Sequence, residues 1–237
     1  MIELNKIYNE DCLVTMNKLN NQSIDYCITS PPYNIKNKNI NKYKEYTDDM
    51  SSEDYYNNQK KIINEMLRIT KKHIFYNIQM VSGNKFVLHR LIGFFYKKIK
   101  EILIWKKQGQ PAISKNVFNS AFEYIIIFSN KSPDKRYFND ANFKRGTQNN
   151  IFNIKNSHFN QYSDIHKAVF PLDLPRFFMI NFGNKKDIWY DPYMGTGTSA
   201  VASIKENKTY LGSEIYKEYV DISEKRLLPY KQQKTLF

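Results

Sequence analysis

The segment TSPPYN, residues 29–34, places a hydroxyl, a rigid carbonyl and an aromatic ring side by side. Pro31 and Pro32 fix the backbone and bring no competing N–H groups. The Ser30 oxygen and the Pro31 carbonyl can therefore accept two hydrogen bonds from one conjugated amino group, which favours a more tetrahedral and more nucleophilic nitrogen. Tyr33 offers a ring on which a base turned out of its helix can stack. The alternative is an ordinary strand end.

A second segment that could bind a ligand is the glycine loop GTGTSA, residues 195–200. It matches the pattern G-x-G-x-x-A between a predicted strand and a predicted helix. Gly195 and Gly197 let the backbone turn sharply and approach a ligand closely. Glu214 follows 17 residues after Gly197, at the end of the next predicted strand. A carboxylate there can accept both hydroxyls of a ribose. The loop therefore predicts a nucleotide-like ligand, either a dinucleotide such as NAD or S-adenosylmethionine.

The residues that precede the loop favour one of these two ligands. Asp191, Pro192, Tyr193 and Met194 separate the strand from the first glycine, whereas a dinucleotide loop passes from strand to glycine at once. A carboxylate at this position suits the cationic amino end of S-adenosylmethionine and would repel a pyrophosphate. An Asp-Pro pair is also a common turn, so the preference depends on the whole loop.

Composition indicates the kind of partner. The chain of 237 residues has 36 Lys and Arg against 23 Asp and Glu, which gives a net charge of +13 and predicts an anionic partner, with nucleic acid before a membrane surface. The two cysteines, Cys12 and Cys27, form no CxxC pair, so we expect buried, reduced thiols and no metal site. No signal peptide and no apolar run of about 18 residues is present, which predicts a soluble intracellular protein.

The elements that must position these segments alternate along the chain. Apolar runs predict strands at 23–29, 72–78, 101–107, 122–129 and 208–215. Helical spacing of apolar residues predicts helices at 53–70, 84–98, 174–183 and 216–229, and a strand, loop and helix unit at 186–207. The alternation indicates an α/β domain with a mostly parallel sheet flanked by helices. Residues 130–165 are rich in Asn, basic and aromatic residues without a period, and we interpret them as an irregular insertion.

Taken together, the two motifs resemble those of the beta class of DNA amino-methyltransferases. TSPPYN (29–34) is similar to the catalytic motif and DPYMGTGTSA (191–200) to the cofactor motif, in the order catalytic motif, insertion, cofactor motif. Five further segments resemble the same family: IYNEDCL (7–13), IWKKQGQPA (104–112), FEYIIIFSNK (122–131), HKAVFPLDLP (166–175) and YLGSEIYKEYVDISEKRL (210–227). Two of them depart from the family pattern, with Glu10 in place of glycine and Lys167 in place of proline.

The resemblance implies a single Rossmann-like methyltransferase domain over residues 1–237, with circularly permuted motifs and a target-recognition region inserted at 130–165. It implies S-adenosylmethionine as methyl donor, S-adenosylhomocysteine as product, and no metal. The catalytic residues would be Ser30, Pro31, Pro32 and Tyr33. The cofactor-binding residues would be Asp11, Asp191, Pro192, Gly195, Gly197, Thr198 and Glu214. The basic residues of the insertion, expected to contact DNA phosphates, are Lys131, Lys135, Arg136, Lys144, Arg145 and Lys155.

Serine in this motif is typical of family members that methylate cytosine N4, whereas aspartate or asparagine is typical of adenine N6. The sequence therefore predicts a cytosine-N4 DNA methyltransferase, with adenine N6 as the alternative. Less favoured are an RNA base methyltransferase, an NAD-dependent oxidoreductase and a nucleic-acid-binding protein without activity. The expected partner is double-stranded DNA in the cytoplasm, at the nucleoid. A homodimer and a cognate restriction endonuclease of a restriction-modification pair are further partners suggested by the family.

Overall fold

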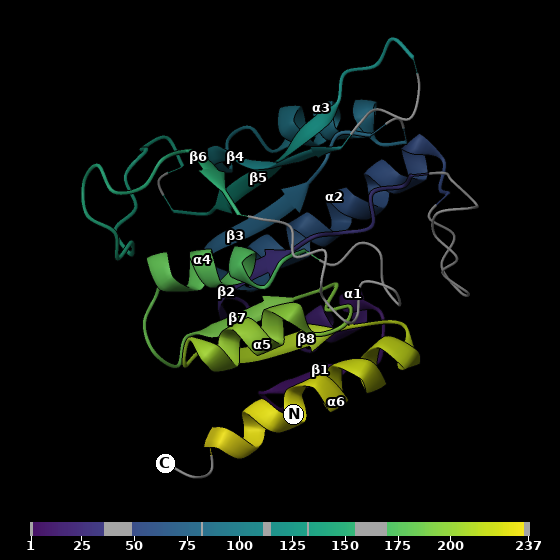
Figure 1. The fold of residues 1–237 in the computed structure, drawn as a ribbon. Helices are drawn as coiled ribbons and strands as arrows, with labels where there is room; N and C mark the ends of the chain where they lie inside the picture. The colour runs from purple at the N-terminus through teal and green to yellow at the C-terminus, as the bar shows by residue number, and fades with distance from the viewer. Residues whose placement is uncertain are drawn as a thin grey trace.

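The computed structural model describes residues 2–35, 49–81, 83–110, 115–131, 133–154 and 170–234. An eight-stranded sheet runs through the centre of the molecule in the order β1-β8-β7-β2-β3-β5-β4-β6 (Figure 1). The strands are β1 Lys6–Tyr8, β2 Ile24–Thr29, β3 Thr70–Ile78, β4 Ile99–Gln110, β5 Ser120–Ser129, β6 Ile151–Asn153, β7 Ile188–Asp191 and β8 Thr209–Ser213. The strands β1, β8, β7, β2 and β3, in this order in the sheet, each run parallel to their neighbours within this set, as the alternating sequence predicts.

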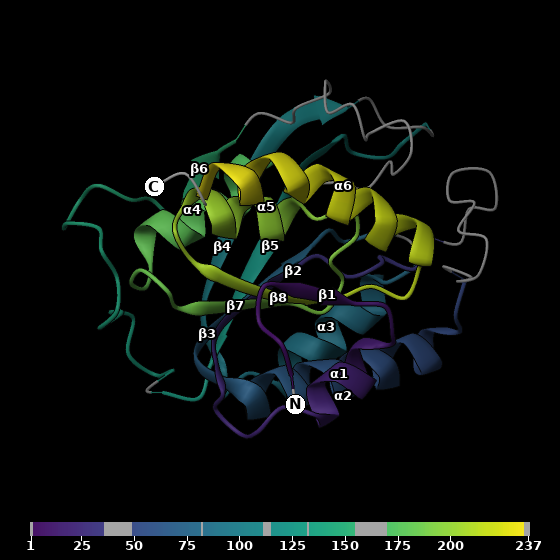
Figure 2. The same ribbon diagram turned by 90° about the horizontal axis from the view of Figure 1, so that it is seen from below.

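The helices cover both faces of the sheet because successive strand residues point to opposite sides. They are α1 Cys12–Asn17, α2 Ser52–Ile69, α3 Lys85–Phe94, α4 Asp173–Asn181, α5 Thr198–Lys205 and α6 Lys217–Lys234. α1, α2 and α3 pack on one face, around buried residues such as Ile63 and Ile74. α4, α5 and α6 pack on the other face (Figure 2). There the Phe75 and Phe178 rings stack with their centroids 4.4 Å apart. The result is the three-layer α/β architecture expected from the sequence.

Some elements differ from the sequence prediction. Among the described strands, β5 alone runs antiparallel to its neighbours, so the sheet is mixed although mostly parallel. The sequence pattern did not predict β1 and α1, which are only three and six residues long. α6 continues beyond Pro229, where the helix was predicted to end. Tyr230 packs against the buried cluster beneath α6, and this contact supports the extra turn despite the hydrogen bond that proline removes.

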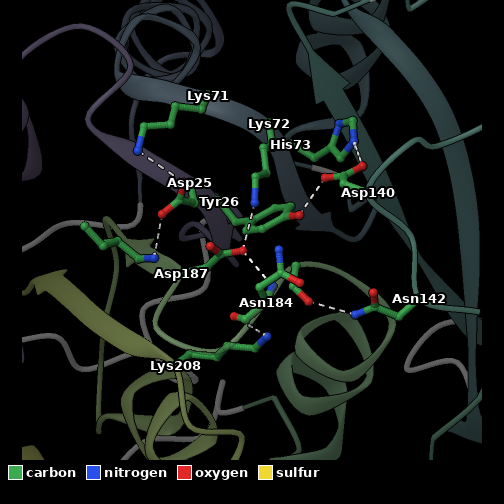
Figure 3. Close-up of polar contacts among 12 residues, drawn as sticks. Asp25, Tyr26, Lys71, Lys72, His73, Asp140, Asn142, Asn184, Asp187 and Lys208 are labelled. Carbon is green, nitrogen blue, oxygen red and sulfur yellow. Dashed lines mark hydrogen bonds and ion pairs between the residues drawn. The ribbon is translucent and has the colours of Figure 1, made fainter.

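The described part of the insertion is attached to the core at the edge of the sheet where β2 and β3 begin. There the Tyr26 hydroxyl donates to Asp140 at 2.5 Å, and His73 Nε2 lies 2.9 Å from the same carboxylate (Figure 3). Burial favours the neutral form of Asp140, but the hydrogen bond and charge of His73 outweigh it and lower the pKa of Asp140 to about 2. β6 then adds a parallel strand beside β4. The described part of the insertion therefore contacts the start of β2 and β3 through Asp140, and it adds β6 to the sheet.

Candidate active site

The two sequence motifs meet at the carboxyl ends of β2 and β7, which are adjacent and parallel. The Thr29 hydroxyl, in the last residue of β2, donates a 2.8 Å hydrogen bond to Asp191, the last residue of β7. Ser30 therefore lies next to the segment that leads into the glycine loop, although 161 positions of sequence separate Ser30 from Asp191. Ligands of open α/β sheets bind outside the carboxyl ends of the strands, and both motifs lie there.

Asp191 is buried, and its carboxylate accepts hydrogen bonds from three groups of the protein. Besides Thr29, it accepts from the backbone N–H of Tyr193 at 3.0 Å and from the Ser199 hydroxyl at 2.5 Å. Burial raises the pKa of Asp191 to about 6, and the three hydrogen bonds oppose that shift. The structure therefore shows Asp191 tying the loop to β2 and to α5. A direct contact with the cofactor stays a prediction.

Asp191→Ala is expected to lower the free energy of unfolding by about 2 kcal/mol or more, because leaving a buried donor unpaired costs about 1–3 kcal/mol. Two hydroxyls and one N–H would lose their acceptor at once. Urea denaturation at pH 7.5 measures the loss. The matched control is Asp173→Ala, because the Asp173 side chain is 72% exposed. Equal stability of the two variants would contradict the role given to Asp191.

The glycine loop adopts a backbone that requires glycine. Gly195 and Gly197 have φ of 54° and 83°, in the left-handed region that side chains disfavour. A Cβ on Gly197 would also lie 3.1 Å from the Ser223 side chain. α6 supports the loop from behind, because Ser223 donates to the Gly195 carbonyl and Arg226 donates to both the Thr196 carbonyl and the Thr198 hydroxyl. Thr198 thus contacts α6 and begins α5.

Glu214 lies directly after β8 and contacts the glycine loop. Its two carboxylate oxygens accept from the backbone N–H groups of Gly195, at 2.8 Å, and Tyr216, at 2.9 Å. Among the described residues no Lys, Arg or His forms an ion pair with Glu214. Burial raises its pKa to about 7, and the backbone hydrogen bonds oppose the shift. A buried carboxylate with lone pairs left over suits the hydroxyls of a nucleoside.

Asp11 completes this end of the sheet. It follows β1, which pairs with β8, and the backbone N–H of Glu214 donates to the Tyr8 carbonyl at 3.0 Å. The Asp11 carboxylate caps α1 by accepting from the Leu13 N–H at 2.7 Å. Asp11, Glu214 and the glycine loop therefore lie at the carboxyl ends of three neighbouring strands, which is the arrangement that a shared ligand needs.

The Ser30 and Tyr33 side chains point toward each other, with their oxygens 3.0 Å apart. Tyr33 also donates to Glu123 of β5 at 2.7 Å, and the Asn77 amide of β3 lies 3.2 Å from the Ser30 oxygen. Burial raises the pKa of Tyr33 well above its ordinary value, and the negative charge of Glu123 adds to the shift. The tyrosine is therefore neutral, its hydroxyl is anchored, and its half-buried ring is fixed in orientation.

The rest of the motif is held from the side of α2. Tyr55 donates to the Pro32 carbonyl at 2.7 Å. Asn34 is buried with φ of 57°, and its side chain donates to the carbonyls of Met50 and Gly83 and accepts from the Met50 N–H. Asparagine tolerates this left-handed conformation better than most residues do. The final residue of TSPPYN thus anchors the loop that presents Tyr33.

The described basic residues that were predicted to bind DNA do not gather at the carboxyl ends of β2 and β7, where the catalytic motif lies. Ser129 pairs with His73 near the start of β3, so Lys131 lies roughly 13 Å or more along the sheet from Asn77, at about 3.3 Å per residue. Lys135 is near that same edge, since its carbonyl accepts from Lys100. Arg136 pairs with Glu101 there, and Lys144 and Arg145 are exposed before β6. Lys155 lies outside the described residues. Their contact with DNA stays a prediction.

Several polar residues of the site were not identified from the sequence. They are Asn77, Lys107, Glu123, Ser223 and Arg226. Glu123 and Asn77 each interrupt an apolar strand run, FEYIIIF and HIFYNI, and a buried polar residue in such a run is the signal that would have found them. Cys12 and Cys27 are free and buried, as predicted, and burial raises the pKa of both thiols to about 12.

The sequence profile of a family described as DNA methylase, of the N6 and N4 type, matches residues 24–225. The chain belongs to this DNA methylase family. It is 27% identical to the orphan methyltransferase M.BamHII of Bacillus amyloliquefaciens, over 88% of this chain and 90% of that protein.

Solved structures share the fold. The PvuII DNA methyltransferase (cytosine-N4-specific) superposes with a TM-score of 0.74 at 20% identity, over 93% of this chain and 85% of that one. The protein TTHA0409 of Thermus thermophilus, solved in complex with S-adenosyl-L-methionine, has a TM-score of 0.65 at 18% identity, over 94% of this chain and 95% of that one. The Rossmann-like methyltransferase fold predicted from the motifs is confirmed.

This methyltransferase uses S-adenosylmethionine, which supplies a methyl group bound to a cationic sulfur. The residues at the carboxyl ends of β1, β7 and β8 fit such a ligand, because Glu214 offers lone pairs and the glycine loop offers close backbone approach. Family membership favours this activity over an NAD-dependent oxidoreductase. Within the described ranges no group of three or more His, Cys, Asp or Glu residues could hold a metal ion. None of the described helices is long and apolar enough to cross a membrane.

Proposed function

We propose that this DNA methyltransferase transfers the methyl group to N4 of a cytosine turned out of double-stranded DNA, and that Ser30, Pro31, Pro32 and Tyr33 form the pocket for that base. The observation that carries the proposal is the hydroxyl of Ser30, half-buried beside Tyr33 and one residue from the Thr29–Asp191 hydrogen bond. In the family that the motif resembles, serine at this position is typical of cytosine-N4 methylation. The methyltransferase with a TM-score of 0.74 is also described as cytosine-N4-specific.

The chemistry follows from what each group can do. Ser30 and the Pro31 carbonyl accept the two hydrogens of the exocyclic amine, which draws the nitrogen lone pair out of conjugation with the ring. No described residue donates to the Pro31 carbonyl, whereas the Pro32 carbonyl is already bonded to Tyr55. Tyr33 stacks on the base while its hydroxyl stays bonded to Glu123. After transfer the amine is cationic and acidic, so its proton can leave to water without a dedicated base.

A nucleoside analysis tests the choice of base. Plasmid DNA from a host without other methyltransferases, expressing this protein, is expected to contain N4-methylcytosine after digestion to nucleosides and mass spectrometry. The same plasmid with Ser30→Ala is the control. N6-methyladenine without N4-methylcytosine would replace the proposal with the adenine alternative. Methylation confined to cellular RNA would favour an RNA substrate, and sequencing of modified positions would give the recognition site.

We propose two further partners, a cognate restriction endonuclease and a second copy of the chain. The family is common in restriction-modification pairs, which supports a cognate endonuclease, whereas the relative M.BamHII is named an orphan methyltransferase. The genetic neighbourhood of this protein tests between the two cases. A homodimer follows from the family resemblance and is tested by light scattering of the purified protein. Because its substrate would be cellular DNA, we propose that the enzyme acts in the cytoplasm, at the nucleoid.

A further inference from the structure

Directly behind Ser30 and Tyr33 lies an ion pair that no sequence motif indicated. Lys107 of β4 donates to Glu123 of β5 at 2.6 Å, and their side chains are 13% and 9% exposed. The other Glu123 oxygen accepts from the Tyr33 hydroxyl and from the Asn77 amide, both at 2.7 Å. Glu123 therefore connects a buried positive charge to the predicted base pocket.

A count of the available hydrogens fixes the direction of each hydrogen bond. An ionised carboxylate only accepts, so the Tyr33 hydroxyl must give its single hydrogen to Glu123. The Tyr33 oxygen is then an acceptor, and the Ser30 hydroxyl, 3.0 Å away, can give its hydrogen to it. With its hydrogen directed at Tyr33, the Ser30 oxygen keeps its lone pairs for donors. The two hydrogens of the Asn77 amide have three oxygens in reach, those of Glu123 at 2.7 Å, Tyr33 at 2.9 Å and Ser30 at 3.2 Å, so a lone pair of Ser30 is left for the amino group of a base.

The orientation of the Asn77 amide fits a negative charge at Glu123. Its nitrogen faces the carboxylate, while its oxygen is buried without a hydrogen-bond partner. Buried polar atoms are rarely left unpaired, because water is no longer there to satisfy them. The opposite orientation would place the amide oxygen against a negative charge. The carboxylate, with the Tyr33 and Ser30 oxygens that the same nitrogen approaches at 2.9 and 3.2 Å, therefore favours this amide orientation even though one buried oxygen goes unsatisfied.

We propose that Glu123, held by Lys107, is a positioning residue that directs the hydroxyl hydrogens of Tyr33 and Ser30 so that Ser30 meets the target amino group as an acceptor. This inference rests on the proposed function of the catalytic motif and adds two residues to it. Without the carboxylate, the Tyr33 hydrogen is free to point at Ser30. The Ser30 hydrogen would then turn toward the substrate and compete with the amine.

Glu123→Gln tests this inference in the purified full-length protein. The probe is single-turnover transfer from tritiated S-adenosylmethionine to unmethylated plasmid DNA, with enzyme in excess over sites. We expect the rate to fall on the order of 10- to 100-fold, the range of losses from misoriented catalytic groups, with cofactor affinity by calorimetry within about twofold of wild type. The matched control is Glu101→Gln. Glu101 lies on neighbouring β4 and pairs with the exposed Arg136, away from the catalytic motif, so this variant should keep the rate. A wild-type rate in Glu123→Gln would overturn the inference.

A double-mutant cycle separates positioning from general stability. In a Ser30→Ala background, Glu123→Gln should cost less than about threefold, because its target is already gone. Additive losses would show that Glu123 acts elsewhere and would overturn the inference. If Glu123→Gln fails to fold, Tyr33→Phe removes the connecting hydroxyl alone, and a wild-type rate in that variant overturns the inference as well. A slow Ser30→Ala beside a fast Glu123→Gln defeats the inference only, whereas wild-type rates in all variants also defeat the proposed function.

Discussion

Ser30→Ala is expected to lower the rate of methyl transfer on the order of 10²–10³-fold, the loss seen when one preorganised hydrogen-bonding group is removed from a site that stabilises a transition state. The alanine variant keeps the Pro31 carbonyl and the Tyr33 ring, so the base can still enter. What it loses is the acceptor that draws the amine lone pair out of the ring. Cofactor affinity should stay near that of wild type, since the glycine loop and Glu214 are held by other residues.

The measurement is single-turnover transfer together with calorimetric titration of S-adenosylmethionine. Ser129→Ala is the matched control, because Ser129 is a buried serine of the same sheet at the opposite edge, bonded to the Lys72 carbonyl. Both variants delete one hydroxyl, and only Ser30→Ala should slow the chemistry. A rate within about threefold of wild type in Ser30→Ala would remove this residue from the mechanism.

The motifs could be predicted from the sequence because each is a short continuous segment with its own conformational requirements. Gly195 and Gly197 adopt the positive φ for which glycine was expected. Alternating apolar runs also predicted the sheet and its helices, since burial on both faces leaves such runs in every parallel strand. β1 and α1 were missed because three and six residues are too few to show a period.

Contacts between distant strands could not be predicted in the same way. Glu123 meets Tyr33 across 90 positions of sequence, and Lys107 meets Glu123 only because β4 and β5 are antiparallel neighbours. A strand pattern gives the face of each residue but not the direction of the strand. Asp191 shows the converse limit. Its position at the loop mouth was clear from the sequence, yet its three hydrogen bonds inside the fold were not.

The basic charge illustrates a further limit. An excess of Lys and Arg predicted an anionic partner, and membership of the DNA methylase family agrees with that prediction. Charge does not specify a face, however. Lys131 and Arg136 follow β5, and β5 runs away from the catalytic motif because it is antiparallel to β3. Had β5 been parallel to β3, the same residues would lie at the edge of the sheet where Ser30 lies, two strands away.

Glu214→Gln is expected to weaken S-adenosylmethionine binding on the order of 10-fold at pH 8, since a hydrogen bond to a charged acceptor contributes about 1.5–3 kcal/mol. The effect should depend on pH in the wild type. Burial raises the pKa of Glu214 to about 7, so the carboxyl is protonated below that pH in the free protein. Binding that requires the ionised form must then release this proton, and affinity should fall as the pH drops from 8 to 6.

The raised pKa of Glu214 also affects the stability of the free protein, which changes with pH in the opposite direction to cofactor affinity. A raised folded pKa means that Glu214 stabilises the fold fully below its ordinary value of 4.5, and this contribution is lost as the pH rises through about 7.

Calorimetric titrations of S-adenosylmethionine at pH 6, 7 and 8 test the predicted loss of affinity. Glu206→Gln is the control, because Glu206 pairs with Arg176 at the far end of α5. Glu214→Gln should show a flatter pH dependence than the wild type from pH 8 to pH 6, with most of the difference below pH 7. Between pH 7 and 6 the raised pKa of Asp191 contributes in both proteins. Because that contribution is common to both, the difference between the two profiles reports Glu214, and parallel profiles from pH 8 to pH 6 would exclude Glu214 as the ribose acceptor.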